Sequence, residues 1–113
     1  THAQEPEWFS TAPVGASEKA LAKAGWQVGD VDLWEINEAF AVVPMALMHD
    51  LKVPHDIVNV NGGACALGDP IGASGARIMV TLLHALRARG LKKGLATLCI
   101  GGGEATAMCL ELL

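Results

Sequence analysis

Three residues of the sequence could do chemistry together, namely Asn37, Asp69 and Cys99. They supply an amide, a carboxylate and a thiol, and each lies within or soon after an expected β-strand. In open α/β sheets the carboxyl ends of parallel strands share one edge, and ligands bind there. We therefore expect the three side chains to converge on a common pocket.

Each of these residues also has a purely structural interpretation. Asn37 can cap the helix that follows it, and Asp69 can cap the next one. A free cysteine is usually a small buried hydrophobe, which is the alternative for Cys99. The three glycines that follow Cys99 favour a reactive thiol, because the N–H groups of such a turn can bind an oxyanion and lower a thiol pKa.

Asp69 lies in a glycine-rich stretch, residues 59–77, which reads NVNGGACALGDPIGASGAR. A strand end, a tight glycine turn and a helix N-terminus together favour an anion or a developing oxyanion. A phosphate-binding loop would need Lys-Ser/Thr where this chain has Asp69-Pro70, and the glycines at 101–103 do not form a dinucleotide fingerprint. The spacing therefore argues against nucleotide binding.

Composition limits the possible classes of protein further. The chain has 113 residues, of which 51% are hydrophobic, so it can bury the core of a single domain. Its net charge of −4 argues against a nucleic-acid surface, and its apolar runs are too short to cross a membrane. Cys65, Cys99 and Cys109 have no metal-ligand spacing and the histidines are scattered, so we expect no metal site and a reducing compartment, the cytoplasm. Cys65 and Cys109 are interpreted as core residues.

The order of the expected elements predicts an α/β domain with helices on both faces of a mostly parallel sheet. Residues 1–11 are expected to be a connecting segment whose Trp8 and Phe9 need a covering surface. The three glycines permit a tight reversal, so the last strand should be antiparallel to the one before it. The expected helices are 13–24, 38–51 and 71–89, and the expected strands are 31–36, 57–60, 95–100 and 104–112.

Three motifs, in this order, resemble the C-terminal half of the thiolases. They are NEAFA at 37–41, NGGACALGDPIGASGAR at 61–77 and CIGGGEATAMCLE at 99–111. The resemblance implies a three-layer α/β/α domain with a mixed sheet and an antiparallel last strand. It also implies that residues 1–113 form a C-terminal domain truncated on its N-terminal side.

The resemblance assigns roles to individual residues. Cys99 would be the acid/base at the substrate α-carbon, Asn37 would hold a water that binds the thioester oxygen, and Gly101 would contribute an N–H to the oxyanion site. Ala39 and Phe40 would line the pantetheine and acyl end of the pocket.

Asp69 departs from the family pattern, which has histidine at this position. A carboxylate accepts hydrogen bonds but donates none, repels an oxyanion and raises the pKa of a nearby thiol. We expect a thiolase that carries Asp69 to lose roughly a hundredfold to ten-thousandfold in activity.

The activity implied by the resemblance is acetyl transfer between two acetyl-CoA units, which is a Claisen condensation or its thiolytic reverse. The acyl-accepting cysteine would come from the missing N-terminal half, so the chain alone would be inactive. Coenzyme A thioesters would be substrates, with no tightly bound cofactor and no metal, and the full-length protein would be a dimer or tetramer. A longer-chain 3-ketoacyl-CoA thiolase and a non-catalytic acyl-CoA-binding domain are the alternatives.

Overall fold

The computed structural model describes residues 1–113, and all of them contribute to one α/β domain. Two of the three expected helices begin later than the sequence indicates, and some of the strands have other bounds. The strands are β1 (His2–Ala3), β2 (Leu33–Ile36), β3 (Lys93–Ile100) and β4 (Glu104–Glu111). The helices are α1 (Ala12–Ala24), α2 (Val42–Leu51), α3 (Ala64–Leu67) and α4 (Ser74–Arg89), with short 3-10 turns η1 (Pro6–Thr11), η2 (Val28–Asp30) and η3 (His55–Ile57).

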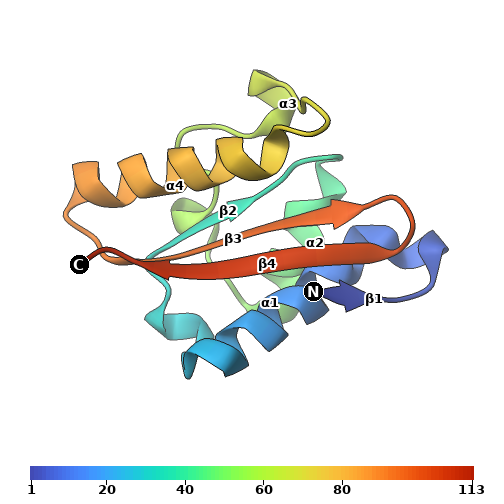
Figure 1. Ribbon diagram of the computed structural model, residues 1–113, viewed down its shortest axis with the longest axis horizontal. Helices are drawn as coiled ribbons and strands as arrows, with labels where there is room; N and C mark the ends of the chain where they lie inside the picture. The colour runs from blue at the N-terminus through green and yellow to red at the C-terminus, as the bar shows by residue number, and fades with distance from the viewer.

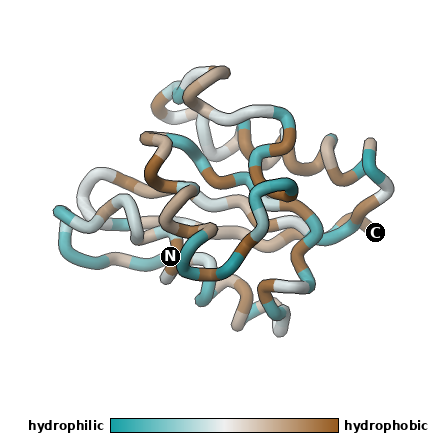
Figure 2. The backbone as a smooth tube through the Cα atoms, turned by 180° about the vertical axis from the view of Figure 1, so that it is seen from behind, coloured by the Kyte–Doolittle hydropathy of each residue, from teal (hydrophilic) through white to brown (hydrophobic).

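The domain has the three expected layers. Figure 1 shows α4 over one face of the sheet and α1 and α2 on the other. A core cluster that includes Trp34 and Ile36 lies on the α1–α2 side, and a second cluster that includes Leu33, Ile78 and Leu82 lies on the α4 side. Figure 2 shows brown, hydrophobic segments and teal, hydrophilic ones following each other along the backbone. All four residues of β2 are buried, as expected for a strand covered on both faces of the sheet.

The sheet is mixed and has the order β1-β4-β3-β2. β2 and β3 are parallel, whereas β3 and β4, and β4 and β1, are antiparallel. The antiparallel last strand is therefore confirmed, but parallel pairing of named strands is confined to β2 and β3. The strand expected at 57–60 is wrong, since only Val58 forms an isolated parallel bridge with Trp34.

Two helix starts differ from the sequence expectation. The expected helix 38–51 begins only at Val42, with Ala41 as its N-cap, so Asn37 does not cap it. The expected helix 71–89 begins only at Ser74, so the prediction of Asp69 as its N-cap is wrong. The expected helix ends are correct, because Gly25 and Gly90 follow α1 and α4 in the left-handed conformation.

The turn between β3 and β4 requires glycine for two reasons. Gly103 has φ of +100°, and a Cβ at this position would collide with the carbonyl oxygen of Gln4. The N-terminal segment therefore lies against the turn, and His2 pairs with Ala105 of β4. The expected connecting segment 1–11 is thus part of the sheet through β1. None of the helices has the length and apolar character needed to span a bilayer.

Candidate active site

A pocket of about 480 Å³ lies at the carboxyl ends of β2 and β3, beside the segment that leads into α4. Asn37, Asp69 and Cys99 all line it, so the expected convergence of the three side chains is confirmed. Gly101 and Ala39 also line it. The complete lining consists of Asn37, Ala39, Asp69, Ile71, Gly72, Ser74, Gly75, Leu98, Cys99, Ile100 and Gly101.

One carboxylate oxygen of Asp69 collects two hydrogen bonds from the wall of this pocket. Asn37 Nδ2 donates to Asp69 Oδ1 at 3.1 Å, and the hydroxyl of Ser74 donates to the same oxygen. The backbone N–H of Asn37 donates to the carbonyl oxygen of Thr97 at 2.9 Å, which continues the pairing of β2 with β3. Asn37 is only 3% exposed, and separate hydrogen bonds hold its side chain and its backbone. Asp69 therefore binds a side-chain amide and a hydroxyl in place of the backbone N–H groups of a helix.

A second polar cluster anchors the glycine-rich stretch to the end of β2. The side chain of Asn59 accepts a hydrogen bond from Ile36 N at 2.8 Å and donates to Ile36 O at 2.9 Å. Asn59 Nδ2 also donates to Glu38 Oε1 at 3.1 Å, and the other oxygen of Glu38 accepts from the backbone N–H of Cys65 at 3.0 Å. A Cβ at Gly63 would collide with the Glu38 carboxylate. The glycine therefore lets the loop close around this carboxylate while Glu38 keeps its hydrogen bonds to Asn59 and Cys65.

The Cys99 thiol is half-buried and its pKa lies above the ordinary value. Burial is the main cause, a hydrogen bond from backbone opposes it, and the negative charge of Asp69 adds to the rise. The prediction of a lowered pKa for this thiol is therefore wrong. The backbone group that opposes the rise belongs to Cys99 itself and not to the glycine turn, and desolvation outweighs it.

The two residues expected at the acyl end of the pocket separate in the structure. Ala39 lines the pocket, whereas Phe40 does not. The Phe40 side chain is 60% exposed and packs edge-on against Phe9, with 6.1 Å between the ring centroids. Its placement in contact with substrate stays a prediction.

The remaining cysteines play no part in the pocket. Cys65 is exposed, so its assignment to the core is wrong, and Cys109 is half-buried. Burial raises the pKa of the Cys109 thiol, and the hydrogen bond to Glu38 is the main cause of the raised pKa at Cys65. The structure contains no group of three or more His, Cys, Asp or Glu side chains that could hold a metal ion.

Sequence reasoning missed two kinds of site residue. Ser74, which binds Asp69, is the serine of GASGAR, and its position five residues after Asp69 was the available signal. Glu35 and Arg77 are the other omission. They form an ion pair below the pocket in which Glu35 is buried and Arg77 is partly exposed, with 3.9 Å between Arg77 Nη2 and Glu35 Oε2. A glutamate in an otherwise apolar strand was the signal there.

The three-layer fold, the mixed sheet and the pocket at the strand ends define an α/β domain of the thiolase type. The chain belongs to the thiolase family, because residues 1–112 match the family described as thiolase, C-terminal domain. It is 59% identical over 109 residues to an acetyl-CoA acetyltransferase of Shinella zoogloeoides, covering 96% of this chain and 28% of the relative.

Comparison with solved structures also finds thiolases that superpose on nearly the whole chain. The acetyl-CoA acetyltransferase of Bacillus anthracis superposes with a TM-score of 0.95 at 46% identity, covering 98% of this chain and 28% of the other. A thiolase of Ascaris suum in complex with coenzyme A superposes with a TM-score of 0.92 at 46% identity, covering 99% and 29%. The chain thus spans less than a third of the length of these relatives.

Proposed function

We propose that this chain forms one side of the active site of an acetyl-CoA acetyltransferase, which transfers an acetyl group between two coenzyme A thioesters. The observation that carries the proposal is the meeting of Asn37, Cys99 and Gly101 in one pocket at the strand ends. The identity of about 59% to an acetyl-CoA acetyltransferase and the likeness to a coenzyme A-bound thiolase support the substrate class.

In this proposal Cys99 is the acid/base. Its thiolate takes a proton from the α-carbon of acetyl-CoA, which leaves a neutral thiol and an enolate. The enolate carbon then attacks the acyl carbon of an acyl-cysteine supplied outside this chain, so that a C–C bond forms, the C–S bond breaks and that cysteine leaves as its thiolate. A thiol of raised pKa is a stronger base once ionised, but less of it is ionised at neutral pH.

Asn37 and Gly101 are proposed to stabilise negative charge on oxygen. The side-chain amide of Asn37 carries two N–H donors, of which one already serves Asp69. The other can hold a water that hydrogen-bonds the enolate oxygen. Gly101 has open space around its Cα, so an acyl oxygen can approach its backbone N–H. A fixed donor of this kind contributes on the order of a hundredfold or more in rate.

Asp69 opposes this chemistry. Its carboxylate faces the pocket where an oxyanion would develop, and its charge raises the pKa of Cys99. The test is a chimaera in which this chain replaces the corresponding segment of the Shinella zoogloeoides relative. We expect the chimaera with Asp69→His to cleave acetoacetyl-CoA a hundredfold to ten-thousandfold faster than the chimaera with Asp69. Equal rates would contradict the role given to this position.

We further propose that the chain acts together with an N-terminal thiolase half that carries the acyl-accepting cysteine. An apolar groove of about 270 Å³ runs between α4 and β4, where Met79, Leu98 and Met108 line it. Trp8, near the N-terminus, is a large apolar side chain that is 59% exposed. Both features support a covering partner. The isolated chain is expected to show no acetyl transfer, and measurable turnover by it would contradict the proposal.

The assembly and location of the complete protein are proposed on the same basis. We expect a dimer or tetramer, no tightly bound cofactor and no metal. The three cysteines are unpaired, which is in keeping with a reducing compartment, the cytoplasm. A longer-chain 3-ketoacyl-CoA thiolase is the alternative to an acetyl-CoA acetyltransferase. Comparing the rates at which the chimaera cleaves acetoacetyl-CoA and a longer 3-ketoacyl-CoA decides between them.

A non-catalytic acyl-CoA-binding domain is the second candidate. Two observations favour it, namely the hydrogen bonds that engage Asp69 with Asn37 and Ser74 and the raised pKa of the Cys99 thiol. Alkylation of Cys99 in the chimaera discriminates between the two functions. Rapid labelling at neutral pH favours catalysis, whereas an inert thiol in a chimaera that still binds coenzyme A favours binding alone.

A further inference from the structure

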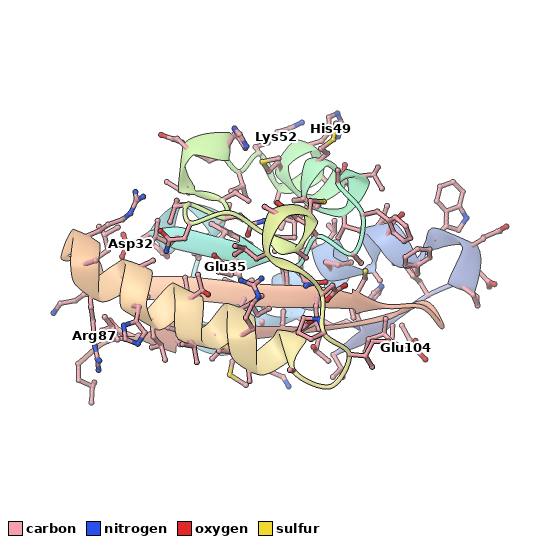
Figure 3. The ribbon with its side chains drawn as sticks, turned by 90° about the horizontal axis from the view of Figure 1, so that it is seen from above. Asp32, Glu35, His49, Lys52, Arg87 and Glu104 are labelled. Atoms are coloured by element: carbon pink, nitrogen blue, oxygen red, sulfur yellow. The ribbon has the colours of Figure 1, made fainter.

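Glu35 is a buried residue of β2, and its side chain lies on the face of the sheet that α4 covers. Successive residues of a strand point to opposite faces, and its neighbours Trp34 and Ile36 belong to the core cluster on the α1–α2 side. Leu33, two residues away, packs in the α4 cluster. Figure 3 shows Glu35 between β2 and α4, whereas the labelled Arg87 lies at the far end of α4. The side chain of Glu35 is only 2% exposed.

Its only cationic neighbour is Arg77 on α4, and the two side chains make an incomplete pair. Arg77 Nη2 lies 3.9 Å from Glu35 Oε2, which is too long for a hydrogen bond. Arg77 Nη1 donates to the hydroxyl of Thr81 at 3.4 Å. Both carboxylate oxygens of Glu35, and Nε and Nη2 of Arg77, are buried without a hydrogen-bond partner in the protein.

A pair of this kind is not explained by its own contribution to stability. Charges removed from water lose their hydration, and a poorly matched buried ion pair is commonly less stable than an apolar pair of the same size. Burial raises the pKa of Glu35 to about 7, which the charge of Arg77 opposes and the charge of Glu38 increases. Ala96, which faces Glu35 from β3, carries no charge. The reason for the pair must therefore be sought in what it holds in place.

The pair lies next to the hydrogen-bonded cluster of Asn37, Asp69 and Ser74, on the side away from the pocket rim. Glu35 lies in β2, and Asn37 directly follows this strand, two residues after Glu35 and on the same side of the sheet. Arg77 stands one turn after Ser74 on α4. The contact between Asn37, Asp69 and Ser74 joins the same two elements at the rim. A shift of α4 along β2 would therefore disturb both contacts together.

We propose that Glu35 and Arg77 are positioning residues for the pocket, which hold the first turns of α4 against the end of β2 and thereby fix the placement of Asn37 relative to Asp69. Neither side chain lines the pocket, so neither touches substrate. This inference rests on the proposed function for its meaning in catalysis, but its test does not need turnover. Glu35 is poised to ionise near neutrality, so the placement of Asn37 should also depend on pH in that range.

The test measures alkylation of Cys99 in the chimaera by iodoacetamide, with labelling followed by mass spectrometry of the Cys99 peptide. The Arg77→Met variant leaves Glu35 without its partner, loosens the contact of Asp69 with Asn37 and lets water reach the thiol. We expect Cys99 to be labelled about threefold faster or more at pH 7.5, which corresponds to a fall of half a unit in its pKa. The double variant with Glu35→Gln also lacks the tie between β2 and α4, so it should be labelled about as fast as Arg77→Met; a return to within about twofold of the parent would show that an unpaired charge, and not lost positioning, caused the change.

Two controls separate positioning from general loss of structure. Arg87→Met removes an exposed arginine of the same helix and should leave the labelling rate of Cys99 unchanged. Cys109, half-buried on β4, reports global opening and should keep its rate in every variant. Equal labelling of Cys99 in the Arg77→Met and Arg87→Met variants, with Cys109 unchanged, would overturn the proposal.

If Arg77→Met unfolds and exposes Cys109, the Glu35→Gln variant tests the positioning role through the pH dependence of Cys99 labelling. In the parent chimaera, the labelling rate of Cys99 should show an inflection near pH 7 in addition to the titration of the thiol itself. Glu35→Gln should remove this inflection, and its persistence would refute positioning by Glu35. A chimaera without acetyl transfer, even with Asp69→His, would count against the proposed function and would leave the labelling result valid.

Discussion

The replacement of Glu35 by glutamine should change how the stability of this chain depends on pH. Burial moves the pKa of Glu35 from 4.5 to about 7, despite the opposing charge of Arg77. The folded state therefore binds the proton more tightly than the unfolded state between these two values. Stability is fully present below the unfolded pKa and falls as the pH rises towards 7. A shift of about 2.5 units corresponds to roughly 3 kcal/mol.

This prediction can be checked by urea unfolding of the 113-residue chain at several pH values between 4.5 and 8. Trp34 is buried in the core and offers a fluorescence signal for the transition. We expect the free energy of unfolding of the parent chain to fall by up to about 3 kcal/mol across this range, relative to that of Glu35→Gln. Curves that run parallel for the two proteins would show that Glu35 does not retain its proton on folding, and the reasoning would then fail.

Two further changes test the pocket and the loop beside it. Asp69→Asn removes the negative charge near Cys99, so the pKa of the thiol should fall and its alkylation near pH 8 should become faster; a slower reaction would contradict the electrostatic role of Asp69. Gly63→Ala pushes the Glu38 carboxylate away from its hydrogen bonds to Asn59 and Cys65, and should cost about 1 to 3 kcal/mol in urea unfolding. Gly29→Ala, where a Cβ meets no atom within 4 Å, is the matched control, and equal costs would show that the loop yields freely.

The general architecture could be predicted from the sequence, but the helix starts could not. Asp-Pro and Asn are common helix-start residues, so capping statistics placed starts near positions 38 and 70. In the structure, Gly68 and Gly72 both have positive φ, and this irregular backbone delays α4 to Ser74. The carboxylate that a helix would have used binds the side chains of Asn37 and Ser74 instead. A tertiary contact thus overrode a local preference.

The missing strand at 57–60 has an equally local cause. Ile57, Val58 and Val60 have high β-propensity, and this made the segment resemble a strand. Asn59 interrupts it with φ of +47°, which an extended strand does not allow. The side chain of Asn59 then pairs with both backbone groups of Ile36, as a neighbouring strand would do. The edge of β2 is thereby covered by this side chain together with the Asn59 N–H, which donates to Trp34 O, and propensity cannot reveal the side-chain part of this contact.

The site positions were predicted more securely than the elements that carry them, and the reason is geometric. Asn37 and Cys99 lie near the ends of two adjacent parallel strands, and β2 and β3 place Ile36 opposite Thr97. Their proximity depends only on this pairing. The pKa of Cys99, in contrast, depends on the balance between burial, a backbone hydrogen bond and the charge of Asp69. The backbone hydrogen bond comes from Cys99 itself, so the glycine motif reveals none of the three contributions. Residue types and strand ends therefore predict which groups meet, whereas the protonation state of those groups requires the packed structure.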